Sequence, residues 1–171
     1  MIFLTVGSQL PFDRLTAAVD DWAAKRPGAE LFGQVGDTDK PPANFTSVAT
    51  MSPEEYLRRF AEADLIVAHA GMGTIIAALE SSKPMLMLPR VARLGESRND
   101  NQVGTARHFS SFGLFEVVES ESEIPARMDH IVANLESYAR AADEFGVAGS
   151  LLDAIREFVS SKKKCPKFPY E

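Results

Sequence analysis

The chain has 171 residues, of which 45% are hydrophobic and 25% are charged, and its formal net charge is −6. These proportions are typical of one globular domain that folds without a disulfide or a metal ion. The acidic balance argues against a nucleic-acid partner, which would need a broad basic surface. The single cysteine, Cys165, excludes a disulfide within the chain and suits a reducing compartment.

No apolar run approaches the roughly 20 residues that span a bilayer, and the N-terminus lacks the basic region of a signal peptide. We therefore expect a cytoplasmic protein. Its single folded domain is expected over residues 1–161, and a basic, flexible tail is expected over residues 162–171.

Segments typical of strands alternate with segments typical of helices along the chain. Strands are expected over residues 2–6, 31–35, 45–49, 65–68, 85–88 and 115–118. Helices are expected over residues 12–24, 53–63, 75–82, 99–111, 122–135 and 137–161, with an arginine-containing loop over 89–98. The run Leu65–Ala68 is continuously apolar, as in a strand buried on both faces of a parallel sheet. This alternation predicts an open α/β sheet, in which ligands bind beyond the carboxyl ends of the strands.

The strongest local signal is the segment His69-Ala70-Gly71-Met72-Gly73-Thr74, which joins an expected strand to an expected helix. Glycines let the backbone approach a ligand closely, and the unpaired N–H groups at the start of a helix bind anions such as a diphosphate. Ile76 stands where a dinucleotide fingerprint has its third glycine, so that motif is excluded. A second interpretation stays open, namely a tight turn in which Thr74 only caps the helix.

Polar residues also follow other expected strands. Gly7-Ser8-Gln9 offers backbone donors or forms a plain turn, and Asn99-Asp100-Asn101-Gln102 either caps a helix or binds sugar hydroxyls, which both donate and accept hydrogen bonds. Arg90, Arg93 and Arg98 either bind phosphate or an acidic sugar or lie in solvent.

A metal or cofactor site is not expected from the histidines. His69 is expected to have a structural role at the end of its strand. The other two, His108 and His130, lie on expected helices without the spacing of metal ligands.

Taken in order, four motifs resemble the C-terminal, nucleotide-sugar-binding half of glycosyltransferase family 28. They are Thr5–Gln9, Ala63–Thr74, Lys83–Pro89 and Asp100–Gln102. The resemblance implies the Rossmann-like C-terminal half of a GT-B fold, with helices on both faces of a parallel sheet. Short members of the family are especially similar: the catalytic subunit of the dolichol-pathway N-acetylglucosaminyltransferase and the small subunit of bacterial exopolysaccharide glucuronosyltransferases.

The resemblance also implies roles for individual residues. The first glycine loop, residues 7–9, would face the nucleotide and its phosphates, and the glycine-rich turn, residues 71–74, would bind the diphosphate. The amide pair of Asn101 and Gln102 would hold the donor sugar. Met51 lies near the position where the backbone of family members contacts the uracil. The full set expected to bind substrate is Gly7, Ser8, Gln9, Met51, His69, Gly71, Met72, Gly73, Thr74, Arg90, Asn101 and Gln102. One departure concerns the ribose, because the family glutamate that binds its hydroxyls is replaced here by Ala77.

The function implied is that of a donor-binding subunit of an inverting glycosyltransferase, which moves a sugar from a UDP-sugar to a lipid-linked acceptor. A membrane-anchored protein would supply the acceptor-binding half and the catalytic base, so the chain would be peripheral to the membrane and inactive alone. Apolar residues near the C-terminus form a candidate docking stripe: Leu151, Leu152, Ile155, Phe158 and Val159.

Two other functions stay open, and so does assembly into a homo-oligomer. A non-catalytic partner subunit could keep the fold without binding donor, in keeping with Ala77. A sugar-nucleotide epimerase would use the same kind of fold, but it would act alone and would normally be longer.

Overall fold

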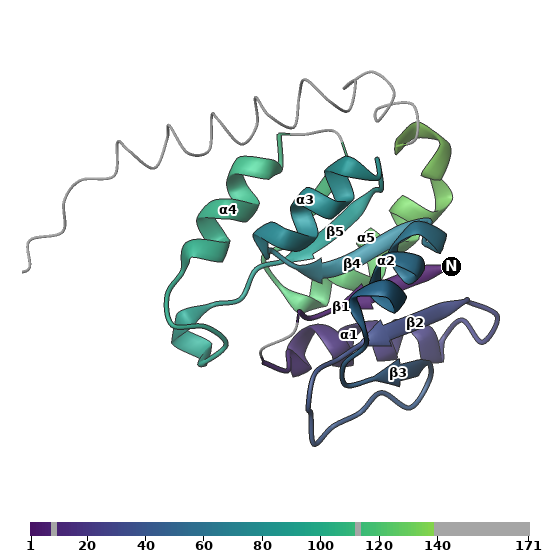
Figure 1. Cartoon of the computed structure of the whole chain (residues 1–171), viewed down its shortest axis with the longest axis horizontal. Coiled ribbons are helices and arrows are strands. Elements are labelled where there is room, and N and C mark those ends of the chain that lie inside the picture. Colours follow the sequence, from purple (N-terminus) through teal and green to yellow (C-terminus); the bar gives the residue numbers. More distant parts are fainter. Residues whose placement is uncertain (8–9, 112–113, 139–171) are drawn as a thin grey trace, which may run out of the picture.

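The computed structural model describes residues 1–7, 10–111 and 114–138 of the chain. In these residues six strands form one sheet in the order β3-β2-β1-β4-β5-β6, and every neighbouring pair is parallel. The strands are β1 (Ile2–Thr5), β2 (Leu31–Gln34), β3 (Thr46–Val48), β4 (Leu65–His69), β5 (Met85–Leu88) and β6 (Phe115–Val117). This is the Rossmann-like α/β sheet that the sequence predicts (Figure 1).

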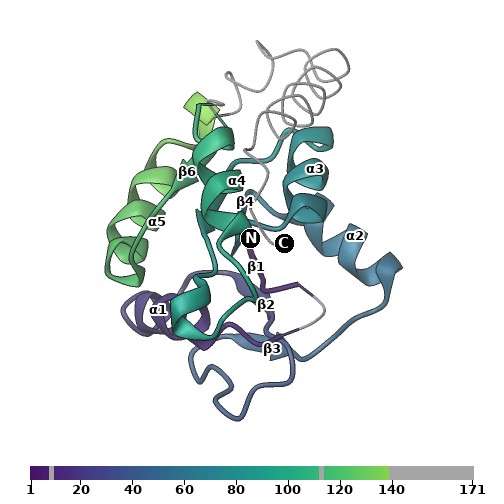
Figure 2. The ribbon, with the colours of Figure 1, turned by 90° about the vertical axis from the view of Figure 1, so that its left-hand side faces the viewer.

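Helices cover both faces of the sheet (Figure 2). They are α1 (Asp13–Ala24), α2 (Pro53–Glu62), α3 (Met72–Glu80), α4 (Asn101–Phe109) and α5 (Ile124–Ala133). Helices α1 and α5 pack on one face, while α2, α3 and α4 pack on the other. Because β1 and β4 are neighbours whose chains leave toward opposite halves of the sheet, the switch point for ligand binding lies between their carboxyl ends.

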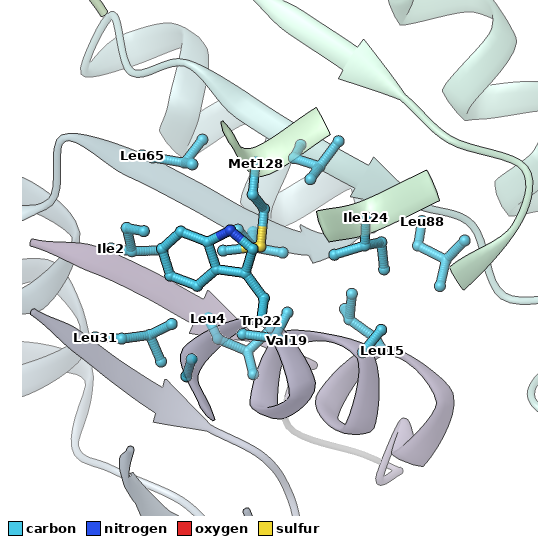
Figure 3. Close-up of a cluster of buried hydrophobic side chains, with 14 of the residues drawn as sticks. Ile2, Leu4, Leu15, Val19, Trp22, Leu31, Leu65, Leu88, Ile124 and Met128 are labelled. Carbon is cyan, nitrogen blue, oxygen red and sulfur yellow. The ribbon is translucent and has the colours of Figure 1, made fainter. Parts of the chain in front are cut away.

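Trp22 is central to the face that α1 and α5 cover (Figure 3). Its indole N–H donates to Asp129 Oδ1 of α5 over 2.9 Å, which satisfies the one polar atom of a ring that is only 2% exposed. On the opposite face the fully buried Phe3 meets Tyr56 and Phe60 of α2 edge to face, at centroid distances of 5.6 and 6.3 Å. The sheet is therefore held between two apolar layers, and its carboxyl edge is left for a ligand.

The expected strands and helices within the described residues are confirmed, with shifts at several ends. The third helix begins at Met72 instead of Ile75, and its N-cap residue is Gly71, so the interpretation of Thr74 as the N-cap is wrong. The fourth begins at Asn101 instead of residue 99. A short 3-10 helix, η2 (Glu121–Glu123), precedes α5, and another, η1 (Ala92–Leu94), lies within the expected arginine loop.

Two expectations fall outside the part of the chain that the structure describes. One is the helix expected over 137–161, which with its docking stripe lies almost entirely beyond Tyr138, and the other is the basic tail over 162–171. Of the helices that are described, none combines the length and the apolar character needed to cross a membrane.

Candidate functional site

A cleft of about 760 Å³ lies at the carboxyl ends of β1, β4 and β5, at the predicted switch point. The described residues that line it are Val6, Gly7, Leu10, His69, Gly71, Gly73, Thr74, Arg90, Glu96, Ser97, Arg98 and Gln102. The structure thus brings together seven of the twelve residues expected to bind substrate, and Arg98 of the arginine-containing loop. The segments that follow β1, β4 and β5 are far apart in the chain and meet here with the first turn of α4, as the parallel topology requires.

The turn between β4 and α3 forms one wall of the cleft. The Gly71 N–H donates to the carbonyl of His69 over 2.8 Å, and the Gly71 carbonyl accepts the first helical hydrogen bond, from Ile75 N–H, over 3.0 Å. The next three N–H groups, of Met72, Gly73 and Thr74, have no acceptor within the helix, and no side chain of the described residues caps it. These donors and the positive end of the helix dipole make the turn suitable for an anion.

The imidazole of His69 fills the space between two glycines. A Cβ built on Gly71 would lie 2.2 Å from His69 Nε2, and one built on Gly7 would lie 2.8 Å from His69 Cε1. Gly7 also has a φ of +82°, which other residues rarely adopt. Burial lowers the pKa of His69 to about 4, and the nearby charge of Arg90 acts in the same direction, so the ring is neutral at neutral pH.

A polar network supports the turn from below. Tyr56 of α2 hydrogen-bonds with the side chains of Thr74 and Thr5, and burial raises the pKa of its phenol while these bonds oppose the increase. The Thr5 hydroxyl also donates to Gln34 Oε1 over 3.2 Å and accepts from Gly7 N–H over 3.3 Å. Thr74 is only 7% exposed, so part of its polar side chain serves to join α2, α3 and β1 beneath the cleft.

The loop after β5 forms the opposite wall and is held in place by carboxylates. Glu96 accepts two hydrogen bonds from the Arg14 guanidinium of α1, over 2.7 and 2.9 Å, and one from Val91 N–H over 2.9 Å. Asp100 Oδ1 accepts from Ala92 N–H over 2.8 Å, so this side chain braces the loop instead of capping α4. Arg98 is exposed at the rim of the cleft.

Not every residue selected from the sequence reaches the cleft. Met51 and Met72 pack against the apolar core, and Asn101 is exposed on α4 outside the lining, where its N–H bonds to Asn99 Oδ1. Gln102 does line the cleft, and its Oε1 accepts from the backbone N–H of Arg90 over 3.2 Å. Ser8 and Gln9 lie outside the described residues.

Sequence reasoning did not select Val6, Leu10, Glu96 or Ser97, although all four line the cleft. Glu96 lies in the loop noted for its arginines, and its pairing with Arg14, 82 positions away, leaves no local pattern. Within the described part of the chain, no cluster of His, Cys, Asp or Glu side chains is arranged to hold a metal ion.

Comparisons with known proteins agree with this geometry. Residues 1–158 match the family described as glycosyltransferase family 28 C-terminal domain. The chain is 30% identical over 102 residues to the UDP-N-acetylglucosamine–N-acetylmuramyl-(pentapeptide) pyrophosphoryl-undecaprenol N-acetylglucosamine transferase of Geobacillus kaustophilus (strain HTA426). That alignment covers 57% of this chain and 28% of the relative.

Solved structures share the fold. MurG of Acinetobacter baumannii superposes with a TM-score of 0.60 at 19% identity, over 92% of this chain and 49% of that one. The UDP-GlcNAc 2-epimerase of Neisseria meningitidis, solved with UDP-GlcNAc bound, superposes with a TM-score of 0.58 at 12% identity, over 93% of this chain and 43% of that one. The chain thus spans less than half the length of each of these relatives.

The similarity covers less than half of each solved chain, and the match to the C-terminal domain family covers residues 1–158 of this chain. The six-stranded parallel sheet and the cleft at its carboxyl edge are therefore those of the C-terminal half of a GT-B fold. The chain belongs to the glycosyltransferase family 28 C-terminal domain family.

Proposed function

We propose that the chain is the donor-binding part of an inverting glycosyltransferase, which transfers a sugar from a UDP-sugar to a lipid-linked acceptor. The observation that carries the proposal is the cleft itself, in which the uncapped N-terminus of α3 faces the loop after β5 and the first turn of α4. The donor's diphosphate would lie against the N–H groups of Met72, Gly73 and Thr74. Its sugar would lie toward Gln102.

The chemistry follows from the placement of these donors. When an acceptor hydroxyl attacks the anomeric carbon, the bond to the diphosphate breaks and negative charge develops on the leaving UDP. Fixed backbone N–H groups at a helix N-terminus stabilise that charge without reorganising. Arg98, exposed at the rim and without a carboxylate partner among the described residues, is placed to add a positive charge.

The proposal does not give this chain the catalytic base. His69 is packed between two glycines, and with a pKa of about 4 it is a weak proton acceptor. We propose that a membrane-associated acceptor-binding partner supplies the base. Leu10, which lines the cleft, is 52% exposed, and Leu94 in the loop after β5 is 50% exposed; these apolar side chains support a partner surface on this side.

The ribose contact is the least conventional part of the proposed site. Ala77, which stands in place of the family glutamate, packs toward the apolar core, and Glu80 is exposed outside the cleft lining. The carboxylate in the described lining, Glu96, is already bonded to Arg14. We therefore expect the diphosphate to contribute more of the affinity than the ribose does.

The decisive experiment uses a glycine at which the protein itself has room for a methyl group. A Cβ on Gly73 meets no atom within 4 Å, so Gly73→Ala should fold normally while placing a methyl group where the diphosphate approaches. Gly104→Ala is the matched control, because Gly104 is also helical, also has no atom within 4 Å of a Cβ, and lies outside the cleft lining.

Calorimetric titration with UDP, in the presence of the acceptor-binding partner, should show binding by the wild type and by Gly104→Ala. Gly73→Ala should lose about tenfold in affinity for UDP, or ~1.4 kcal/mol. Titrations with GDP and dTDP test which nucleobase the site prefers. Absence of UDP binding by the wild type would refute the proposal.

Ala77 favours one alternative, a partner subunit that keeps the fold without using a donor. Reconstituted transfer that is unaffected by Thr74→Val and Gln102→Ala would support that alternative. Conversion of UDP-N-acetylglucosamine by the chain alone would instead indicate an epimerase.

A further inference from the structure

Arg90 has an unusual environment for a charged residue. It is the second residue after β5, and it is only 5% exposed. Its Nη1 donates to the carbonyls of Pro11 (2.9 Å) and Glu96 (3.3 Å), and its Nη2 donates to those of Val6 (2.9 Å) and Leu10 (2.7 Å). The four Nη hydrogens are thus matched by four backbone carbonyls, which leaves none of them for a ligand.

The partners of Arg90 belong to different walls of the cleft. Three of the carbonyls lie in the segment that leads from β1 to α1, and the fourth lies in the loop after β5. The backbone N–H of Arg90 donates to Gln102 Oε1 of α4. One residue therefore joins three chain segments that are separated by up to 84 positions and that all line the cleft.

Among the residues that the structure describes, none forms an ion pair with Arg90, and its charge is stabilised in other ways. The guanidinium carbon lies 4.5 Å from the centroid of the Phe12 ring, within the range of a cation–π contact. The side chain of Glu96 is bonded to Arg14 and to Val91 N–H instead. Since the bonds of Arg90 are to carbonyls, their geometry fixes backbone positions, and this is the property that a binding site needs from its supporting residues.

We infer that Arg90 is a positioning residue of the donor site. It holds the described residues on either side of the β1–α1 turn, the loop after β5 and the first turn of α4 at the spacing that a nucleotide diphosphate requires. The inference rests on the proposed function. It assigns to Arg90 an indirect role in place of the direct phosphate contact that an arginine in this loop suggests.

A lysine cannot replace this side chain. Its ammonium group has three hydrogens on a single nitrogen, so it cannot reach four carbonyls that surround a planar fork. Arg90→Lys should therefore keep the charge but release part of the loop. We expect UDP affinity to fall about tenfold, and amide exchange at Gly7 and Val91, which border the released segments, to accelerate.

The control is a second arginine, Arg26, whose guanidinium also lies over an aromatic ring but which is outside the cleft lining. Arg26 stacks on Trp22 at 4.8 Å and pairs with Asp129 between α1 and α5. Arg26→Lys should lower the melting temperature while leaving both the UDP affinity and the exchange of Gly7 and Val91 at wild-type values. Arg26→Lys thus shows the effect of a loss of stability alone. Arg90→Met is a second variant of Arg90, which removes the charge as well as the hydrogen bonds.

The experiment combines hydrogen exchange without nucleotide and calorimetry with UDP, on the full chain with its acceptor-binding partner. Faster exchange at Gly7 and Val91 together with weaker UDP binding in Arg90→Lys, but not in Arg26→Lys, supports the inference. Wild-type affinity in Arg90→Lys overturns the inference alone, and so does unchanged exchange at both amides. No UDP binding by the wild type overturns the proposed function and the inference with it.

Discussion

The contact between Gly71 and His69 gives a quantitative prediction about why this turn needs glycine. In Gly71→Ala the new methyl carbon would lie 2.2 Å from His69 Nε2 and 2.8 Å from Cε1, well inside van der Waals contact. The ring has little room to swing away, because the same two atoms, Cε1 and Nε2, also lie close to Gly7. The turn or the ring must therefore move, although Gly71 itself has ordinary extended backbone angles, with φ of −85° and ψ of 131°.

Forcing one extra carbon into a packed site costs typically 1–3 kcal/mol, so we expect Gly71→Ala to lose about 2 kcal/mol of unfolding free energy. For a chain of this size that loss corresponds to roughly 4–8 °C in melting temperature. The cost arises from the imidazole, so it should largely vanish when His69 is also replaced by alanine. The expected coupling energy in the double-mutant cycle is at least about 1 kcal/mol.

The assay is urea unfolding of the wild type, Gly71→Ala, His69→Ala and the double variant, followed by circular dichroism. His69→Ala by itself creates a cavity and is destabilising, and the cycle removes that contribution by subtraction. Equal destabilisation by Gly71→Ala with and without the histidine ring would refute the steric argument.

Further predictions concern pH, the core and the loop after β5. The pKa of His69 is lowered from 6.5 to about 4 in the folded protein, so below pH 6.5 the unfolded chain binds the proton first. Stability should fall by up to roughly 3 kcal/mol between pH 6.5 and pH 4; His69→Asn should flatten this part of a stability–pH curve, and an unchanged slope would contradict the assignment. Phe3→Ala should cost about 4 kcal/mol in urea unfolding, because Phe3 is fully buried. Leu57→Ala, at a side chain that is 64% exposed, should change the unfolding free energy by no more than about 0.5 kcal/mol. Equal losses of unfolding free energy in the two variants would show that the core is wrongly identified. Glu96→Gln should lower stability by about 1 kcal/mol and weaken UDP binding, because the two bonds from Arg14 that fix the loop become weaker; wild-type UDP affinity in this variant would show that the loop does not shape the site.

Hydrophobic patterning was sufficient to locate the sheet and the cleft. The apolar runs that form β4 and β5 are buried on both faces, which only a central parallel strand requires, and the rule for parallel sheets then places the site at their carboxyl ends. The glycines of the turn could be recognised because they come directly after one of these strands, β4. The start of α3 was not, because Met72 and Gly73 have no pattern that marks a first turn, and the cap is a glycine without a side-chain bond.

The support of the site was beyond prediction from local patterns. The bond from Arg90 to Val6 joins residues 84 positions apart, and a buried guanidinium that donates to backbone carbonyls leaves no sequence signature at the carbonyl positions. Likewise, the hydrogen bonds between Tyr56 and the threonines of β1 and α3 depend on how α2 lies over the sheet. Such contacts come from tertiary packing, so the sequence alone could indicate only that a loop with arginines follows β5.

A structure of the chain crystallised with UDP tests the central claim most directly. The account predicts diphosphate oxygens within hydrogen-bond distance of the N–H groups of Met72, Gly73 and Thr74, between His69 and the loop after β5. UDP bound elsewhere on the molecule, or a cleft left empty or filled by the protein's own side chains, would contradict it.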